Sequence, residues 1–192
     1  MKKFVAMIFI LLANFIYAAK DLSTLKTLKF EAEERQVING KEKTLKYLVQ
    51  MEFPDKIRKE IIFPDLNRGE LYIYQGNKKL LYLPIFDEYK ESEIDGDENR
   101  IIQAINRLID LEKNSSTFKK DYHQKRLKDF YIDDSEAISV YIKEYLEKED
   151  YILPKSIEIR EGNINLGIVI LKNVEINPKL DREEFKLEKE KK

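Results

Sequence analysis

The sequence predicts an α+β fold in which a curved antiparallel sheet is covered by a helix. Three observations support this prediction. Apolar residues occupy every second position in several short segments, as they do in strands with one buried face. Turn signals containing glycine and asparagine separate some of these segments, which is typical of hairpins. One segment in the middle of the chain repeats its apolar residues with helical spacing instead, so a helix interrupts a succession of strands.

The clearest predicted strand covers residues 45–53. Apolar residues occupy every second position, and Lys46, Gln50 and Glu52 alternate with them, as a half-buried strand requires. Asn39 and Gly40 precede it, and an Asn-Gly pair is a strong hairpin signal. We therefore expect this strand to pair with residues 30–37. Its apolar members are Leu45, Tyr47, Val49, Met51 and Phe53.

The next part of the chain predicts three consecutive strands of an antiparallel meander. The first strand alternates apolar residues with Lys59 as a polar interruption, and a Gly-Asn turn joins the other two. Pro54 and Pro64 fall at strand ends, where a missing N–H removes no hydrogen bond from the sheet. The three expected strands cover residues 57–63, 71–74 and 80–83.

Residues 97–113 predict the long helix, with Asp97 as its N-cap. The apolar residues recur at i, i+1, i+4, i+7 and i+8, which places them on one stripe. Those residues are Ile101, Ile102, Ile105, Leu108 and Ile109.

The pattern after this helix returns to strands. The pattern at residues 115–128 is ambiguous. It is compatible with a second short helix, in which Phe118 and Tyr122 are spaced four apart. Alternation resumes beyond them, and a Glu-Gly-Asn turn separates the last two strands. These strands are expected at residues 137–145, 155–160 and 166–176.

The first 19 residues predict a signal peptide. Two lysines precede an apolar run of about 12 residues, and small residues follow where a signal peptidase cuts, near Ala18 or Ala19. The run is shorter than the ~20 residues of a membrane-spanning helix, although an N-terminal membrane anchor stays the alternative. We expect export to the periplasm, with one domain at residues 20–185 and a charged tail at 186–192.

Composition narrows the class of protein. The chain after the predicted signal carries 33 basic and 36 acidic residues, a net charge of −3. A nucleic-acid-binding protein generally needs a concentrated basic face, so we expect no nucleic-acid partner. The chain has no cysteine, which excludes disulfides and a lipidated cysteine. Its stability must therefore come from packing.

Residues suited to catalysis or metal binding are scarce. His123 is the single histidine and stands in a polar stretch, so we predict an ordinary surface residue. One imidazole without cysteine cannot supply the usual ligands of zinc, copper or iron. The acidic residues at 95–98 fit a helix cap better than a calcium loop. With no phosphate-binding loop or nucleophile elbow, we predict no enzyme, no metal and no cofactor.

Three short motifs follow one another along the chain. The first is a Pro-x-x-apolar-Arg-x-Glu segment, the second a strand after a glycine turn that ends in Tyr-x-Pro. The third is a proline, two alternating strands, an asparagine-rich end and a phenylalanine. The matching residues are Pro54, Ile57, Arg58 and Glu60, then Gly76, Tyr82 and Pro84, then Pro154, Ile157, Ile159, Asn173, Asn177 and Phe185. In this order the motifs resemble the LolA-type periplasmic lipoprotein carriers and the wider group of outer-membrane lipoprotein-sorting proteins.

The resemblance implies a half-open β-barrel covered by a helical lid, whose concave apolar face shelters the acyl chains of lipoproteins. Hiding one chain of ~14 methylenes from water is worth ~11 kcal/mol at ~0.8 kcal/mol each, so such a site needs apolar surface and little chemistry. The lid would be the helix at 97–113. The expected lipid-binding residues are Tyr47, Val49, Met51, Ile57, Ile61, Leu71, Ile73 and Leu81 on the wall, and Ile101, Ile105, Leu108 and Ile109 on the lid.

The sequence departs from the carriers in two places. Many of them have an arginine before the first proline that holds the lid shut, whereas this chain has Phe53. Their N-terminal helix is also reduced here to a few residues. Both departures concern lid control and cargo more than the fold. The same apolar faces also fit an ordinary core between a sheet and a helix.

We expect a monomeric periplasmic carrier that takes an acylated lipoprotein from an inner-membrane transporter to an outer-membrane acceptor, without a covalent step. The alternative is a binding module of the same fold that carries or senses another lipid, or that regulates an envelope protein. An envelope hydrolase is a third interpretation, for which the sequence favours no particular carboxylate.

Overall fold

Ten antiparallel strands form one curved sheet. The computed structural model describes residues 19–38, 40–94, 100–133, 135 and 137–186. Within these residues the strands are β1 (Thr27–Ile38), β2 (Lys41–Glu52), β3 (Lys56–Phe63), β4 (Leu71–Gln75), β5 (Lys78–Leu83), β6 (Glu88–Glu93), β7 (Asp129–Tyr131), β8 (Ile138–Lys148), β9 (Tyr151–Glu161) and β10 (Ile164–Ile176).

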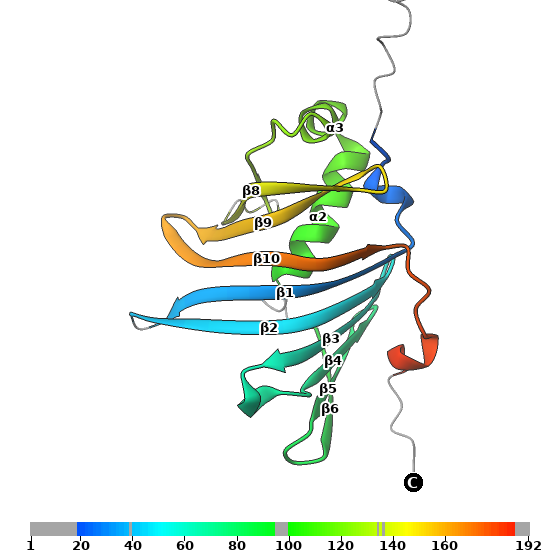
Figure 1. Cartoon of the computed structure of the whole chain (residues 1–192), viewed down its shortest axis with the longest axis vertical. Coiled ribbons are helices and arrows are strands. Elements are labelled where there is room, and N and C mark those ends of the chain that lie inside the picture. The colour runs from blue at the N-terminus through cyan, green and yellow to red at the C-terminus, as the bar shows by residue number, and fades with distance from the viewer. Residues whose placement is uncertain (1–18, 39, 95–99, 134, 136, 187–192) are drawn as a thin grey trace, which may run out of the picture.

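The first and last strands of the chain are neighbours in this sheet. The spatial order is β6-β5-β4-β3-β2-β1-β10-β9-β8-β7 (Figure 1), so two meanders meet where β1 pairs with β10. Ala32 of β1 lies opposite Tyr47 on one side and Leu171 on the other. The β1–β10 pairing therefore joins the two halves into a single concave surface.

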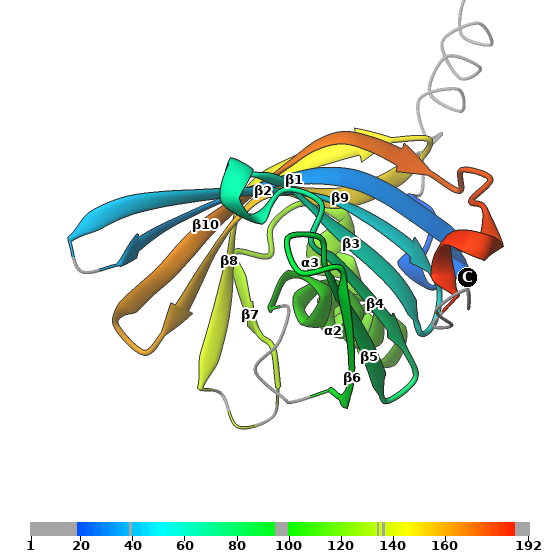
Figure 2. The same cartoon turned by 90° about the horizontal axis from the view of Figure 1, so that it is seen from below.

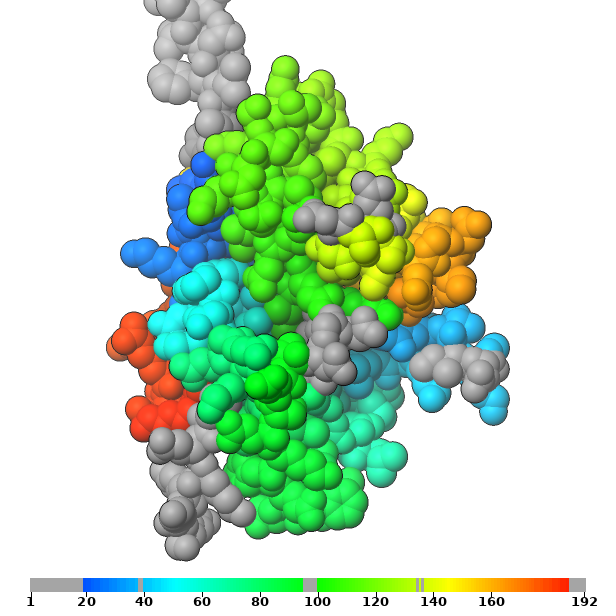
Figure 3. Space-filling view, turned by 180° about the vertical axis from the view of Figure 1, so that it is seen from behind, coloured from blue at the N-terminus to red at the C-terminus, as the bar shows by residue number. Residues whose placement is uncertain are grey.

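Two helices lie on the concave side of the sheet. They are α2 (Arg100–Asn114) and α3 (Ser116–His123). Figure 2 shows the sheet curving around α2, and Figure 3 shows both helices from the opposite side to Figure 1. The α+β class, with a curved open sheet and a helical cover, is confirmed. No helix in the described ranges is both long and apolar enough to span a bilayer.

The predicted elements agree with the structure in most of the chain. The long helix is confirmed, although its predicted N-cap, Asp97, lies outside the described residues, as do Asn39 and residues 1–18 of the predicted signal. The second short helix is α3, whose first turn is capped by the Ser115 hydroxyl, 3.2 Å from the Phe118 N–H. Strands β6 and β7 were not predicted. All six residues of β6 are exposed, so no apolar alternation marks it.

Side chains on the concave face form the core. Tyr47, Val49 and Met51 of β2 are almost fully buried, each at most 1% exposed. Ile57 and Ile61 of β3 lie opposite Met51 and Tyr47 and belong to the same apolar cluster. The apolar stripe of α2 packs on this surface, and its residue Leu108 is only 1% exposed.

Two acidic side chains form ion pairs on the convex face. The Glu33 carboxylate accepts hydrogen bonds from Lys172 Nζ at 2.6 Å and from Arg35, and these cations lower the pKa of Glu33 to about 2. The Lys143 and Arg160 side chains likewise lower the pKa of Glu158. Each carboxylate links its strand to a neighbouring one. Glu33 of β1 binds Lys172 of β10, and Glu158 of β9 binds Lys143 of β8.

These pKa shifts predict the acid sensitivity of the protein. A carboxyl group whose pKa is lower in the folded state stabilises it above the pKa of the unfolded chain, near 4.5, and loses that contribution as the pH falls. We expect the free energy of unfolding, measured in urea, to fall steadily between about pH 4.5 and pH 2. Glu33→Gln should reduce this slope. An equal slope in the variant would contradict the assignment.

Leu108 tests how strongly the helical cover stabilises the sheet. Leu108→Ala removes buried methyl groups from between α2 and the strands and should lower the free energy of unfolding by about 2–5 kcal/mol. Lys113→Ala, at an exposed position of the same helix, should change it by less than about 0.5 kcal/mol. Thermal and urea unfolding measure both. Equal effects would show that α2 is only loosely attached.

Candidate functional site

An enclosed apolar cavity lies between α2 and the concave face of the sheet. Its volume is about 20 Å³, roughly the space of one water molecule. Binding pockets for small ligands usually measure about 300–1,000 Å³, so this cavity cannot hold an acyl chain while α2 stays in place. The sheet and the N-terminal 3-10 helix η1 (Leu22–Thr24) contribute Leu22, Leu28, Phe30, Val140, Ile157 and Leu171, among others.

The structure brings the four predicted lid residues together at this cavity. Ile101, Ile105, Leu108 and Ile109 all line it. The predicted wall residues Val49, Met51, Ile57 and Ile61 are buried in the same core but lie outside the cavity lining. Whether any of these side chains contacts a lipid stays a prediction.

Two predicted wall residues lie on the wrong face of the sheet. Ile73 pairs with Arg58, and Leu71 pairs with Glu60, so both project from the convex side. Neither belongs to the concave core cluster. The segment around them is apolar or aromatic at every position, so alternation alone could not choose the face. The pairing with β3 turns Tyr72 and Tyr74 inward instead.

Residues 80–83 are apolar or aromatic at every position, so the register of β5 decides which of them face the core. Leu81 lies opposite Tyr72 on the concave side, whereas Leu80 lies opposite Ile73 on the convex side. Leu80 is nevertheless buried, as is Phe185 of the C-terminal 3-10 helix η3 (Arg182–Phe185), which packs near β3. The convex face of this half of the sheet therefore has its own small apolar cover.

Several residues of the family-like motifs occupy turns and the convex face, whereas Ile57, Ile157 and Ile159 belong to the core cluster. Arg58 binds the Glu60 carboxylate at 2.8 Å. Tyr82 packs on the ring of Tyr89, with 4.6 Å between ring centres. Gly76 has a positive φ of 57° in the β4–β5 turn, Pro84 packs against Gly69, and Pro54 lies between β2 and β3. These placements give the motifs a structural part in the sheet.

A second hollow opens beside the apolar cavity, at the N-terminal end of α2. Its volume is about 350 Å³, and Ile101 lines both spaces. Unlike the cavity, this open hollow has charged groups in its lining, from β1, β3 and α2. Its lining residues include Glu34, Gln36, Tyr47, Lys59, Arg100 and Ile101.

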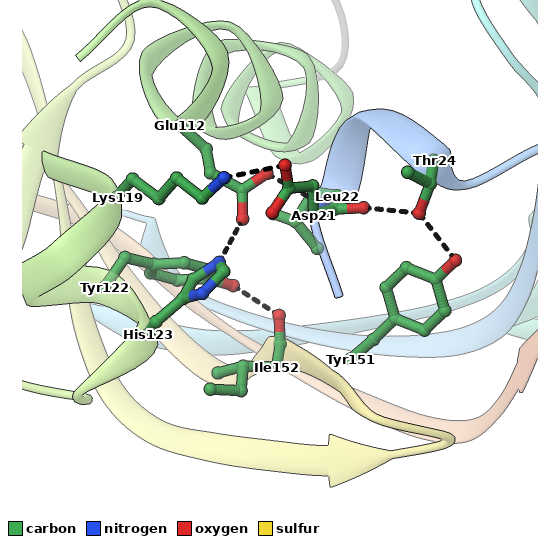
Figure 4. Close-up of polar contacts among 9 residues, drawn as sticks. All are labelled: Asp21, Leu22, Thr24, Glu112, Lys119, Tyr122, His123, Tyr151 and Ile152. Atoms are coloured by element: carbon green, nitrogen blue, oxygen red, sulfur yellow. Dashed lines mark hydrogen bonds and ion pairs between the residues drawn. The ribbon is translucent and has the colours of Figure 1, made fainter. Parts of the chain in front are cut away.

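The C-terminal end of α2 is fixed by a buried carboxylate. Glu112 is 2% exposed. One of its oxygens accepts the Leu22 N–H at 2.6 Å, and the other lies 2.6 Å from His123 Nε2 (Figure 4). Glu112 thus joins η1, α2 and α3, and we call these contacts the Glu112 latch.

The prediction that His123 is an ordinary surface residue is wrong. Its side chain is 17% exposed and bound to Glu112. The polar sequence around it concealed this, because α3 turns only one side toward the core. On that side Tyr122 is also buried, and its hydroxyl donates to the Ile152 carbonyl oxygen at 2.7 Å (Figure 4). Burial raises the pKa of Tyr122 well above its usual value.

Asp21, Glu112 and His123 bring potential metal ligands within 4.8 Å of one another. These groups are already engaged by protein partners. The Lys119 ammonium lies 2.7 Å from the Asp21 carboxylate (Figure 4), where it supplies positive charge to the cluster. The geometry is that of a hydrogen-bonded junction between the N-terminal segment and the two helices.

Sequence reasoning missed the half of the cavity that comes from the chain termini. Leu28 and Phe30 of β1 and Ile157 of β9 do alternate with polar neighbours, so their inward direction was detectable. Their place against α2 depends on the β1–β10 pairing, which joins residues more than 130 positions apart. Local patterns carry no signal for that pairing.

No protein-family model and no curated protein sequence matches the chain. Several solved structures are similar to it, among them these three. The first is a DUF1329 family protein from Desulfovibrio piger, with a TM-score of 0.61, 11% identity, and coverage of 86% of this chain and 91% of that chain. The second is a LolA superfamily protein from Nitrosomonas europaea. Its TM-score is 0.59 at 12% identity, with 85% of this chain and 91% of that chain covered.

The third is an outer-membrane lipoprotein-sorting protein domain from Vibrio parahaemolyticus. Its TM-score is 0.58 at 12% identity, with 83% of this chain and 89% of that chain covered. At identities this low, the TM-scores establish a shared architecture and do not show which ligand this chain binds. The chain therefore has the LolA-like fold that its sequence motifs predicted.

Proposed function

We propose that the protein shelters acyl chains between α2 and the concave face of its sheet. The supporting observation is the apolar cavity enclosed beneath an amphipathic helix, in a sheet that does not close on itself. Because the enclosed volume is only about 20 Å³, the described conformation is the closed one. Ligand entry requires α2 to move away from the strands.

The first candidate cargo is an acylated lipoprotein. Two of the similar structures are a LolA superfamily protein and an outer-membrane lipoprotein-sorting protein domain, and the first 19 residues of this chain predict a signal peptide. In this proposal a monomer in the periplasm accepts the lipoprotein from an inner-membrane transporter and releases it to an outer-membrane acceptor. Transfer follows from relative affinities, so the protein acts as a carrier without enzymatic activity or cofactor.

The second candidate is a module that carries or senses a different lipid, or that regulates an envelope protein. The open hollow favours it, because charged side chains line the space next to the apolar cavity. Phe53, in place of the lid-holding arginine of many carriers, also points to different control of the helix. The two candidates differ in the head group they must accommodate.

A variant on the inner side of α2 tests whether the space under this helix holds the cargo. Purified protein incubated with membranes that bear labelled lipoproteins should yield soluble labelled complexes. Ile109→Glu should abolish them, because a carboxylate in the cavity lining costs several kcal/mol of desolvation when covered by a lipid tail. Lys113→Glu, on the exposed side of the same helix, should have no effect. Phospholipid alone in native mass spectra would support the second candidate.

The Glu112 latch predicts how α2 moves. Its C-terminal end is tied to η1 and α3, whereas the open hollow borders its N-terminal end, so opening should pivot about Glu112. Glu112→Ala leaves the Leu22 N–H and the His123 ring without their acceptor and should lower the free energy of unfolding by about 1–3 kcal/mol for each of these groups. The variant should also take up the neutral dye N-phenyl-1-naphthylamine faster in stopped-flow fluorescence.

Asp110→Ala provides the matched control for the latch. Asp110 lies two residues away on the same helix, and its carboxylate makes exposed contacts with Arg107 and Asn114, which contribute little. Stability and dye uptake should match the wild type. If Glu112→Ala behaved like this control, α2 would not depend on the latch.

A further inference from the structure

Lys59 places a positive charge on the concave face of the sheet, next to its apolar core. It lies on the same side of β3 as Ile57 and Ile61, directly opposite Val49. Its ammonium is 4.2 Å from the centre of the Tyr47 ring and 5.6 Å from that of Tyr72. Cation–π contacts at such distances partly replace water around an ammonium. The two rings therefore hold Lys59 at the open hollow.

The neighbouring acidic group is bound by neutral donors. The Tyr47 hydroxyl lies 3.1 Å from one Glu34 oxygen, and the Gln36 amide donates to the other. These contacts stabilise Glu34 next to the hollow and fix the Tyr47 ring under Lys59. The cation–π site is thus built from β1, β2, β3 and β4, which are neighbouring strands of one sheet.

Arg100 adds a second cation from the lid side. It is the first residue of α2 and lines the same hollow as Lys59. Its Nε is buried and has no hydrogen-bond partner among the described residues. A buried donor without an acceptor is costly, and a ligand oxygen would satisfy it.

The hollow and the apolar cavity together have the polarity of an amphiphile. Ile101 lines both spaces, so a polar group in the hollow can continue into a tail under α2. We infer that the hollow binds the anionic head group of an acyl-chain lipid, a phosphate or carboxylate, through Lys59 and Arg100. This inference rests on the proposed function, because it assumes that the tail enters the space under α2.

The binding of an anion between these two cations would connect the wall to the lid. Lys59 belongs to β3, and Arg100 belongs to α2, so one ligand anion contacting both links the sheet to the N-terminal end of the helix. Each contact would join opposite charges, and such charge-assisted hydrogen bonds are stronger in a partly dry space than in water. A bound head group would thus favour closure of α2 over the tail.

Three ligands with the same palmitoyl chain test the inference. They are monopalmitoylglycerol, which is neutral, palmitate, which is a carboxylate, and 1-palmitoylglycerol 3-phosphate. Each is titrated into the protein loaded with N-phenyl-1-naphthylamine, and dye displacement is measured by fluorescence. At least one anion should displace the dye at about tenfold lower concentration than the neutral lipid. The stronger of the two anions identifies a phosphate or a carboxylate head group.

Substitutions then assign the preference to the two cations. Lys59→Met and Arg100→Met should each reduce the preference for the anion severalfold or more while the dye still binds, whereas Lys59→Arg should retain it. Lys46→Met is the matched control, since Lys46 lies on the same sheet but faces the convex side near Glu33. If Lys59→Met does not fold, Arg100→Met decides the question alone.

The outcomes separate this inference from the proposed function. If no palmitoyl lipid displaces the dye, the acyl-chain site itself is wrong. If the neutral and anionic lipids displace it equally, the acyl-chain site stands and the head-group inference is overturned. An anion preference that survives in both Met variants would also overturn it, because the charge would then be recognised elsewhere.

Discussion

The apolar contact between α2 and the concave sheet is the constraint on which the rest of the structure depends. A ten-stranded sheet that curves without closing leaves an apolar inner face, and such a face exposed to water favours aggregation. Helix α2 covers it with Ile101, Ile105 and Leu108, all of which are buried. The contact that stabilises the empty protein is therefore the contact that a tail under α2 has to replace.

This competition limits how tightly a lipid can be held. A tail gains the free energy of leaving water, but the protein gives up the packing of α2 on the strands, and only the difference contributes to binding. A carrier profits from this arrangement, because cargo bound too tightly would not be released. The small enclosed volume and the potential for acyl binding are thus compatible, provided that the helix can move.

The sequence predicted the strands and the covering helix because their signals are local. Alternation located β2 and β3, and the apolar stripe located α2. Alternation did not reveal β6, because its residues are all exposed. It also did not show which face of the sheet Leu71 and Ile73 occupy, because that depends on hydrogen bonds to another strand. The lid side of the cavity could be predicted from one helix, whereas its sheet side needed the pairing of β1 with β10, a contact between distant parts of the chain.

The two ends of α2 differ in what holds them, and this difference gives the helix a direction of movement. At the C-terminal end, Glu112 has both oxygens bound by groups from η1 and α3, and breaking those bonds inside the protein would leave buried polar groups unpaired. At the N-terminal end, Arg100 borders an open hollow and its Nε lacks a partner within the described chain. Among the described residues, the hydrogen bonds that join a buried side chain of α2 to other elements are those at its C-terminal end. We therefore expect the helix to open beside Lys59 first, so that a lipid would meet charged and aromatic groups before it reached the apolar space beyond Ile101.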